Sequence, residues 1–537
     1  MPSRPFISKR SYSFKSKGSR PLRSISRLFR AIKSKSVPAA VMGACFLGLF
    51  SYSYAFDIFK GGTKSSASVL EYHNGLRRDG VYIDRTLTKA SARLFHLDPS
   101  FKARIKGAIY AQLLYVARGG GKGIIIAASE QNNVAAFDAV TGKTLWERNL
   151  GSPVPLSDLP CGNIDPLGVT GTPVINKSSG TIYVDAMTTP DGGRTKKHLV
   201  YALSLKNGSV VHGWPVDIPA RAIYGEIAFN SSVQNQRGAL AFVKGRVYVP
   251  YGGFFGDCGQ YRGWLIGIPA SNPASPKAWA TGAIAGGSWA PGGAASEGGK
   301  IFISTGNTRD AKRWSGGEAI LRFSEGPVWS GKPADYFAPE NWKELDSSDE
   351  DLGGTGPIIV DLPGSKPSGL VVALGKDGKI YLLDRDNLGG IGGQATVASV
   401  SSDRIIGAAA AYTTARGTYV VFKGKGIHCP DGQSGDLTAV RLVAGSPPSV
   451  KIAWCADQHG KGSPMVTTTD GHSQAIVWSV GAEGDNRLHG FDGDTGQVVY
   501  SGAKGGLIGR VRRFQTPILA DGRIYVAADG VIKAFSR

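Results

Sequence analysis

Short apolar runs separated by glycine and proline recur along most of the chain and have the alternating pattern typical of β-strands. Two copies of one unit are clear, Val134–Trp146 (VAAFDAVTGKTLW) and Leu488–Val499 (LHGFDGDTGQVV). Weaker copies are centred on Leu203, Ile268, Phe323, Leu383, Val440 and Phe535. Consecutive centres lie 44 to 66 residues apart. A strand-rich unit of this length predicts blades arranged around an axis.

Further strands surround this motif in each unit. A unit opens with a turn and a proline before a β-branched run, as in Gly171–Val174, because proline is tolerated at the first position of a strand. A second strand follows a glycine turn, as in Gly180–Val184 and Gly522–Val526. With the counted motif as the third strand and an outer fourth strand, the sequence predicts an all-β fold. We expect an eight-bladed β-propeller of four-stranded antiparallel blades, from about residue 105 to the end.

Two places depart from this regular plan. The last unit stops at Arg537, directly after its third strand, so we expect a segment between Ser66 and Arg104 to supply the missing strand. Residues 326–354 have the composition of a long loop between units. Seven blades with an irregular insertion therefore remain the alternative.

The composition supports a turn-rich β-protein and weakens one functional class. The chain has 75 glycines and 29 prolines scattered between the strand-like runs. Its net charge of +21 suggests nucleic-acid binding at first sight, but the first 56 residues hold 11 Lys and Arg and no acidic residue. Taking those 11 charges from +21 leaves +10 for the rest of the chain, spread over its length. We therefore expect no nucleic-acid partner.

The N-terminal part looks like a targeting segment. Residues 1–35 are basic, and residues 36–56 are uncharged and long enough for one hydrophobic helix across a bilayer. We expect either a signal peptide, cleaved after Ala55, or a transmembrane anchor, with an organellar transit peptide as another possibility. The propeller would then lie outside the cytoplasm, membrane-anchored or secreted, and in the periplasm of a Gram-negative bacterium. Residues 57–104 would connect this segment to the propeller at 105–537.

Cysteine usage agrees with export. Apart from Cys45 in the apolar segment, the chain has Cys161, Cys258, Cys429 and Cys455. An even number in an exported domain permits disulfides. Cys429 and Cys455 flank one strand run and are expected to pair within a blade, which leaves Cys161 with Cys258. Four buried thiols are the alternative.

The motifs LHGFDGDTGQVV and AAFDAVTGKTLW resemble the repeat of the pyrroloquinoline quinone (PQQ) propeller superfamily. This superfamily includes quinoprotein alcohol dehydrogenases and a non-catalytic outer-membrane assembly lipoprotein. The resemblance covers nearly the whole chain beyond residue 105. The segment 69–116, with Cys161-Gly162-Asn163 and Gly256-Asp257-Cys258, also resembles a group of exported PQQ-repeat proteins of undefined role.

The resemblance implies candidate site residues around PQQ and Ca²⁺. Ser304-Thr305-Gly306-Asn307 resembles the strand end that supplies a Ca²⁺-binding asparagine, and Asp349 or Asp351 stands where the general base for alcohol oxidation is sought. Asp257 is a candidate metal ligand one residue away from the expected position, which Cys258 occupies. The adjacent-cysteine disulfide of the enzymes is absent. Asn307 as a turn residue and the two aspartates as a solvated loop are the alternative interpretations.

These observations favour a binding or scaffolding module over an enzyme. We expect an exported, membrane-tethered propeller that binds a protein or a small molecule at its axis, the membrane being contacted through the N-terminal segment. The alternative is a PQQ- and Ca²⁺-dependent dehydrogenase that oxidises an alcohol or sugar. Three tryptophans, Trp264, Trp289 and Trp342, could line a binding surface or pack between blades.

Overall fold

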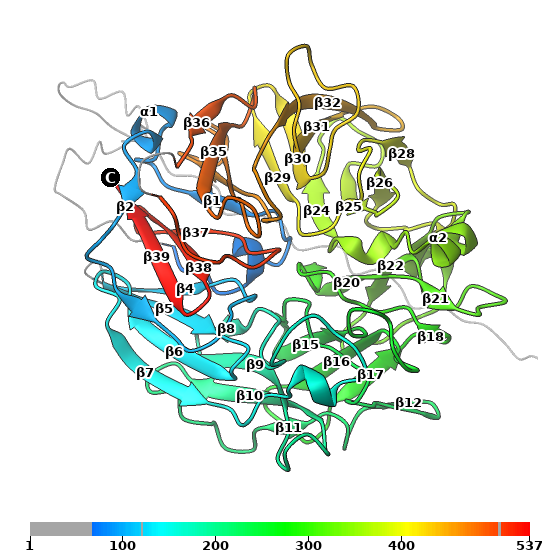
Figure 1. Cartoon of the computed structure of the whole chain (residues 1–537). Coiled ribbons are helices and arrows are strands. Elements are labelled where there is room, and N and C mark those ends of the chain that lie inside the picture. Colours follow the sequence, from blue (N-terminus) through cyan, green and yellow to red (C-terminus); the bar gives the residue numbers. More distant parts are fainter. Residues whose placement is uncertain (1–66, 120–121, 503–505) are drawn as a thin grey trace, which may run out of the picture. The chain divides into compact units, whose positions relative to one another are not determined.

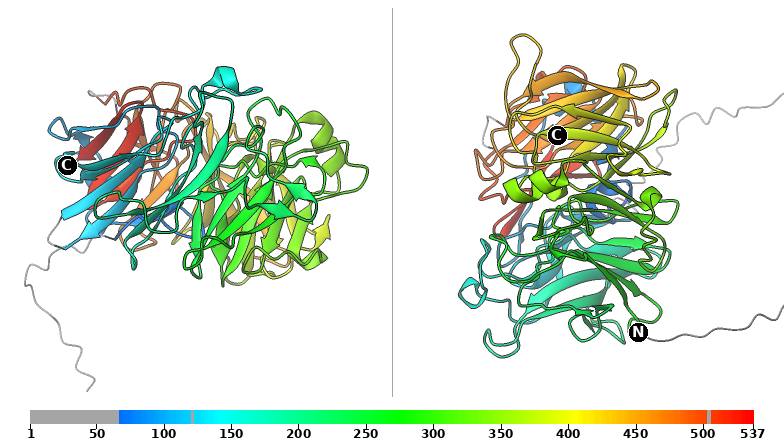
Figure 2. Two further views of the ribbon diagram at one scale, coloured as in Figure 1. Left: turned by 90° about the horizontal axis from the view of Figure 1, so that it is seen from below. Right: turned by 90° about the vertical axis from the view of Figure 1, so that its right-hand side faces the viewer.

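The computed structural model describes residues 67–119, 122–502 and 506–537. Within these residues eight antiparallel sheets follow one another around an axis (Figure 1). Figure 2 shows the same ring from two sides, with the connecting loops on its two faces. The protein is therefore an all-β, eight-bladed propeller, as the sequence predicts.

Each blade has four antiparallel strands, numbered outward from the axis in chain order in the first seven blades. The first blade consists of β4 (Leu114–Arg118), β5 (Lys122–Ala128), β6 (Asn133–Asp138) and β7 (Thr144–Asn149), and the second of β8 (Val174–Asn176), β9 (Thr181–Thr188), β10 (Lys197–Ser204) and β11 (Val216–Asp217). The third blade consists of β14 (Ala241–Val243), β15 (Arg246–Tyr251), β16 (Trp264–Pro269) and β17 (Lys277–Ala280), and the fourth of β19 (Ala295–Glu297), β20 (Lys300–Thr305), β22 (Ala319–Phe323) and β23 (Tyr336–Ala338). The short strand β27 (Gly390–Ile391) adds to the outer edge of the fourth blade, parallel to β23.

The fifth blade consists of β24 (Ile358–Asp361), β25 (Gly369–Leu374), β26 (Lys379–Asp384) and β28 (Thr396–Ser399). The sixth consists of β29 (Ala410–Thr414), β30 (Gly417–Lys423), β31 (Leu437–Val443) and β32 (Ser449–Ala456). The seventh consists of β33 (Met465–Thr468), β34 (Ile476–Val480), β35 (Leu488–Asp492) and β36 (Val498–Tyr500). The eighth blade consists of β37 (Ile518–Ala520), β38 (Arg523–Ala528), β39 (Val531–Ser536) and β2 (His96–Leu97).

A few short elements lie outside the blades. They are the ribbons β12 (Ile223–Tyr224) with β13 (Ile227–Ala228) and β18 (Ile284–Ala285) with β21 (Thr308–Arg309), the helices α1 (Lys89–Ala92) and α2 (Trp342–Ser348), and the 3₁₀ turns η1 (Tyr72–Asn74), η2 (Leu156–Asp158), η3 (Pro333–Asp335) and η4 (Leu352–Gly354).

The eight repeat centres of the sequence all fall in third strands, namely β6, β10, β16, β22, β26, β31, β35 and β39. The seven-blade alternative is therefore wrong. Residues 326–354 are also not simply a loop between units, since they contain β23, the fourth strand of a regular blade, and α2.

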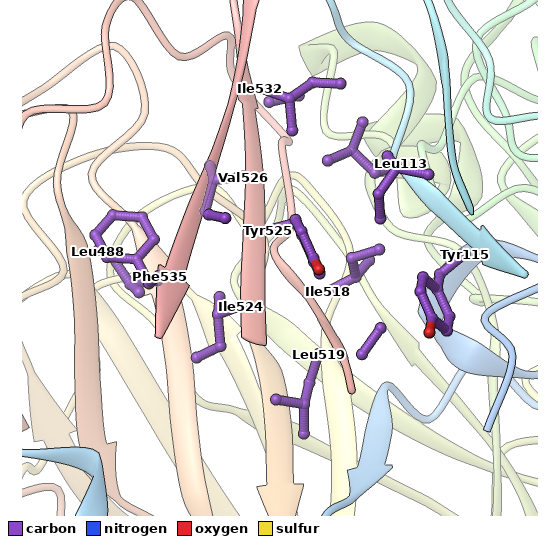
Figure 3. Packing of buried hydrophobic residues seen from close by; sticks show 14 of the residues in the cluster. Leu113, Tyr115, Leu488, Ile518, Leu519, Ile524, Tyr525, Val526, Ile532 and Phe535 are labelled. Carbon is purple, nitrogen blue, oxygen red and sulfur yellow. The ribbon is translucent and has the colours of Figure 1, made fainter. Parts of the chain in front are cut away.

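The third strands are almost continuously apolar because each sheet is covered on both faces. In β26, Ile380 and Leu382 point into the cluster shared with the following blade, while Tyr381 and Leu383 point into the cluster shared with the preceding blade. A strand sends successive side chains to opposite faces, so both sets must be apolar when both faces are buried. Figure 3 shows one such interface, where Ile518 and Tyr525 of the last blade meet Leu113 and Tyr115 at the first.

The ring is closed by chain that precedes the first blade. His96 and Leu97 of β2 pair antiparallel with Ser536 and Phe535 of β39, and β3 (Ala103–Arg104) pairs further along the same strand. This is the outer strand that the last sequence unit lacks, and it comes from the Ser66–Arg104 segment. The two ends of the propeller are thus joined by main-chain hydrogen bonds.

The same segment also fills the axis. Residues 69–84, called the plug here, bond through their main chain to the inner strands of six blades in turn. The pairs are Val69 with Tyr115, Leu70 with Ile175, Leu76 with Ser296, Arg77 with Ile359, Asp79 with Ala411, and Gly80 with Val466. β1 (Val81–Ile83) then runs parallel to β33. The plug therefore links the inner strands of six of the eight blades.

Arg78 connects the plug to the third and fourth blades. Its guanidinium donates to the carbonyls of Leu240 and Ala294, each at 3.0 Å, and to that of Tyr72 at 2.9 Å. Glu71 lies 3.3 Å from it. The side chain is buried and also donates to the carbonyl of Gly75 at 3.2 Å, so four carbonyls and one carboxylate of the described residues surround its guanidinium.

Both expected cysteine pairs are bonded. Cys429 and Cys455 join two parts of the sixth blade, with Cα atoms 5.7 Å apart. Cys161 and Cys258 join the loop after the first blade to a loop of the third, with Cα atoms 6.1 Å apart. No helix in the ranges that the structure describes is long and apolar enough to cross a membrane. The expected hydrophobic helix at 36–56 and the basic leader at 1–35 lie outside those ranges.

Candidate functional site: the axial cavity

A cavity of about 310 Å³ lies at the axis, bordered by loops that precede inner strands and loops that join second to third strands. Its lining residues are Asn163, Arg237, Gly253, Phe254, Phe255, Gly256, Asp257, Tyr261, Trp289, Asn307, Asp349, Asp351, Lys376, Arg404, Ile406, Arg513 and Phe514. We call it the axial cavity. A narrow extension past Arg237 and Phe514 ends on Tyr72 of the plug. The cavity is therefore closed at depth by the plug.

All four residues that the sequence singled out, Asp257, Asn307, Asp349 and Asp351, line this one cavity. They come from three different blades or the loops between them. The interpretation of Asp351 as a solvated loop residue is wrong, because this residue is only 2% exposed. Asp349 is different, since about half of its side chain is exposed.

The carboxylate of Asp351 is held by two groups. One carboxylate oxygen accepts the main-chain N–H of Asn307 at 2.7 Å, and the other contacts the ammonium of Lys376. A Cβ at Gly306 would overlap the first oxygen, so the chain before Asn307 can approach only because that residue is glycine. Both oxygens of Asp351 are therefore occupied by partners from neighbouring blades.

Lys376 is the cation of this cluster. Its Nζ also lies 2.7 Å from Asp349, and Asp349 is in turn 3.3 Å from Arg404. Burial alone would lower the pKa of Lys376, but Asp351 and Asp349 raise it above its ordinary value. Lys376 is thus charged throughout the physiological range.

Glu318 lies behind the cluster as a second buried acid. One of its oxygens accepts the N–H of Leu352 at 2.6 Å, and the other has no partner among the described residues. Burial first, and then the charge of Asp351, raise the pKa of Glu318 well above its ordinary value. Burial therefore favours the protonated form of Glu318, while Asp351 is the acid that pairs with Lys376.

Asp257 lines the same cavity with partners of its own. Its carboxylate accepts the hydroxyl of Tyr261 at 2.5 Å, and its carbonyl accepts Arg309 at 2.6 Å. Burial and the Asp257 charge raise the pKa of Tyr261, so the hydroxyl is a donor. The next residue, Cys258, is tied to Cys161, and a cysteine in a disulfide has no thiolate to offer a metal.

The deepest part of the cavity is cationic. Arg237 is partly exposed, toward the cavity, and its guanidinium lies 5.8 Å from the ring centroid of Phe514. Within the described part of the chain it has neither a carboxylate nor a hydrogen-bond acceptor. Burial lowers the pKa of Arg237, and the nearby acidic groups of Tyr110 and Glu130 oppose that shift.

The sequence does not single out four cationic side chains that line this cavity: Arg237, Lys376, Arg404 and Arg513. Arg513 was visible only as part of a basic group, and Lys376 only as one residue of a glycine-bounded turn. Of the three tryptophans, Trp289 lines the cavity, with Lys376 Nζ 5.4 Å from the centre of its ring. Trp264 packs between the second and third blades, and Trp342 is a buried residue of α2.

The donor set does not fit Ca²⁺, which takes six to eight oxygen ligands. Both oxygens of Asp351 and one of Asp257 are engaged, and the ammonium of Lys376 already stands on the carboxylates. No group of three or more His, Cys, Asp or Glu in the described ranges could hold a metal. The cavity does fit a flat anion, since it offers an aromatic wall and an unpaired guanidinium.

Comparison with known proteins agrees with the fold. No family model matches the sequence, and no curated protein matches it. Among solved structures, quinohemoprotein alcohol dehydrogenase ADHIIG from Pseudomonas putida HK5 superposes with a TM-score of 0.60 at 14% identity, covering 87% of this chain and 80% of that one. The quinohemoprotein alcohol dehydrogenase from Comamonas testosteroni gives 0.59 at 15% identity, with the same coverages.

A europium-containing methanol dehydrogenase gives a TM-score of 0.56 at 15% identity and covers 86% of this chain and 89% of that one. At these identities the similarity speaks for the fold. This chain therefore shares the eight-bladed propeller fold of these three dehydrogenase structures.

Proposed function

We propose that the axial cavity binds a small, flat, polycarboxylated molecule, and that the chain acts as a ligand-binding propeller. The observation that carries this proposal is Arg237, a guanidinium in the cavity that no carboxylate of the described residues contacts. A buried charge is costly unless it is paired, so an anionic ligand is the missing partner. PQQ, a planar tricarboxylate, is the first candidate.

Other lining residues fit the same ligand. The ring of Trp289 is partly exposed and can stack on a flat molecule. Arg404 and Arg513 lie on the cavity wall with exposed or partly exposed guanidinium groups, which suit carboxylates. With Arg237 they supply three cations around one aromatic wall.

A PQQ- and Ca²⁺-dependent dehydrogenase is the second candidate. The contact of the Asn307 main chain with Asp351 favours it, because it joins the expected metal ligand to the expected base. Two features oppose it. Lys376 holds the carboxylate that would act as base, and the oxygen donors left uncommitted are too few for Ca²⁺. Binding without alcohol or sugar oxidation is therefore the function that the geometry supports best.

The test compares binding with turnover in the full chain. The protein is titrated with PQQ in buffer containing either EDTA or Ca²⁺, followed by thermal unfolding, and dye reduction is assayed with alcohols and sugars. We expect a rise in melting temperature that EDTA does not abolish, and no dye reduction. Turnover that requires Ca²⁺ and disappears in Asp351→Asn would establish the dehydrogenase instead.

Matched variants separate the site from general charge effects. Arg237→Gln removes the unpaired cation, whereas Lys206→Gln removes one charge from the exposed turn between β10 and β11. We expect weaker PQQ binding only in Arg237→Gln. Equal binding by both variants would reject the axial site.

We further propose that the propeller is exported and tethered by residues 36–56. The basic leader, the uncharged segment and the two disulfides support this. N-terminal sequencing distinguishes the two forms of export, since cleavage after Ala55 gives a chain that starts at Phe56. Recovery in the soluble cytoplasmic fraction with five free thiols would reject export.

A further inference from the structure

A second cavity, of about 470 Å³, borders the axial cavity on the side of the seventh and eighth blades. Its lining residues are Tyr110, Asn163, Lys461, Glu483, Gly484, Asn486, Arg510, Arg512 and Arg513. We call it the basic pocket. Asn163 and Arg513 line both cavities, so the two are neighbours.

The cations of the basic pocket outnumber the acids that hold them. Arg513 and Lys461 share the single carboxylate of Glu483, at 2.8 and 3.5 Å. Arg512 pairs with Asp529 at 2.6 Å. Four cations therefore face two carboxylates.

Arg510 is the unpaired member. It is exposed, and in the described ranges its side chain has no carboxylate and no hydrogen-bond partner. A guanidinium carries five N–H donors in a planar fork that matches the oxygens of a phosphate or carboxylate. None of these five donors is engaged by a described residue, so the fork can bind a ligand.

The two arginines beside it are already positioned. Arg512 lies 5.6 Å from the ring centroid of Tyr110 while Asp529 accepts its Nε at 2.8 Å. The Nε of Arg513 donates to both oxygens of Glu483, at 3.0 and 2.9 Å. Each of the two guanidinium groups has further N–H donors besides those that its carboxylate accepts. Because both side chains are already held in place, they lose little conformational entropy when these donors bind an anion.

We infer that the basic pocket is a binding site for a small oxyanion, such as a phosphate or a sugar carboxylate, held by Arg510 with Arg512 and Arg513. The axial cavity and its proposed quinone ligand use different cations, apart from Arg513. Because Arg513 lines both cavities, the oxyanion would lie next to the axial ligand. This site is inferred independently of the proposed function.

The experiment is a calorimetric titration of the full chain with inorganic phosphate, glucuronate and glucose, at constant ionic strength set with chloride. We expect saturable binding of one or both anions and none of glucose. The two anion arms identify whether phosphate or carboxylate is preferred. No saturable binding by either anion would overturn the inference.

Variants test the location. Arg510→Gln removes an exposed side chain that bonds to no described residue, so we expect the fold to be kept and the anion affinity to fall about tenfold. Lys206→Gln and Arg237→Gln should leave it unchanged. If Arg510→Gln binds the anion as well as the unaltered chain, the pocket is not the site.

The same variant separates this inference from the axial proposal. PQQ binding by Arg510→Gln should equal that of the unaltered chain. Loss of PQQ binding in Arg237→Gln with intact phosphate binding would support two separate sites. Parallel loss of both ligands in Arg510→Gln would show that the basic pocket is not a site of its own.

Discussion

The chemistry of the axial cavity depends on a few buried charges that residue spacing alone does not bring together. Asp351 is balanced by Lys376, 25 positions further along the chain, and contacted by Asn307, 44 positions before it. Asp351 and Asn307 could be predicted because they stand in recognisable motifs. Lys376 and Arg237 could not, because their roles follow only from ring closure, which places one beside two aspartates and the other under Phe514.

Replacing Lys376 should reveal how much the cluster depends on it. Lys376→Met keeps the apolar stem but leaves Asp351 buried without its cation, so we expect the free energy of unfolding to fall by about 3–5 kcal/mol. Urea denaturation followed by circular dichroism measures this loss. Adding Asp351→Asn to this variant should restore part of it. A loss below about 1 kcal/mol would show that the pair is not essential to the fold.

Glu130, near Arg237, should make stability depend on pH. Burial raises its pKa from 4.5 to about 7, despite hydrogen bonds from the Gly168 N–H and the Thr170 hydroxyl. Between these pH values the folded state holds a proton that the unfolded state lacks. Below pH 4.5 this raised pKa contributes its full amount, about 3 kcal/mol, to the free energy of unfolding. The contribution falls as the pH rises above 4.5 and is lost as the pH rises through 7.

Glu130→Gln removes this titration. Denaturation of both proteins from pH 5 to pH 8 should show the unaltered protein losing stability relative to the variant as the pH rises. A difference that stays constant across this range would contradict the raised pKa of Glu130.

At the scale of elements, the plug and the closing strand are the parts that a repeat pattern predicts least. The missing outer strand follows from the truncated last unit, and β2 supplies it. The plug has no repeat signal, because its main chain rather than its side chains bonds to successive blades. Irregular backbone can be buried at the axis only when its polar groups find such partners.

Arg78 should be the side chain on which the plug depends most. Arg78→Met leaves the carbonyls of Leu240 and Ala294 without donors and Glu71 without its cation, so we expect a loss of about 3–5 kcal/mol in the free energy of unfolding. Arg85→Met, at an exposed position just after the plug, is the control and should change little. Equal stability of the two variants, measured by urea denaturation, would show that the plug is not held through Arg78.

At the scale of the whole molecule, the ring makes a site from loops that are far apart in sequence. The recurrence of third strands predicts eight blades. Both faces of each sheet are buried, so each third strand needs an almost continuous run of apolar residues that can be recognised in the sequence. The apolar pattern does not predict which side chains line the axis. The loops that face the axis do not follow the repeat, so the cations that distinguish this cavity from a metal site can be identified only in the three-dimensional structure.

A fluorescence titration of the full chain with PQQ in EDTA-containing buffer tests the central claim most directly, since Trp289 lines the axial cavity. We predict saturable quenching with one ligand per chain, with an affinity that falls about tenfold in Arg237→Gln and stays unchanged in Lys206→Gln. Absence of saturable quenching, or quenching that requires Ca²⁺ and is the same in both variants, would contradict the account.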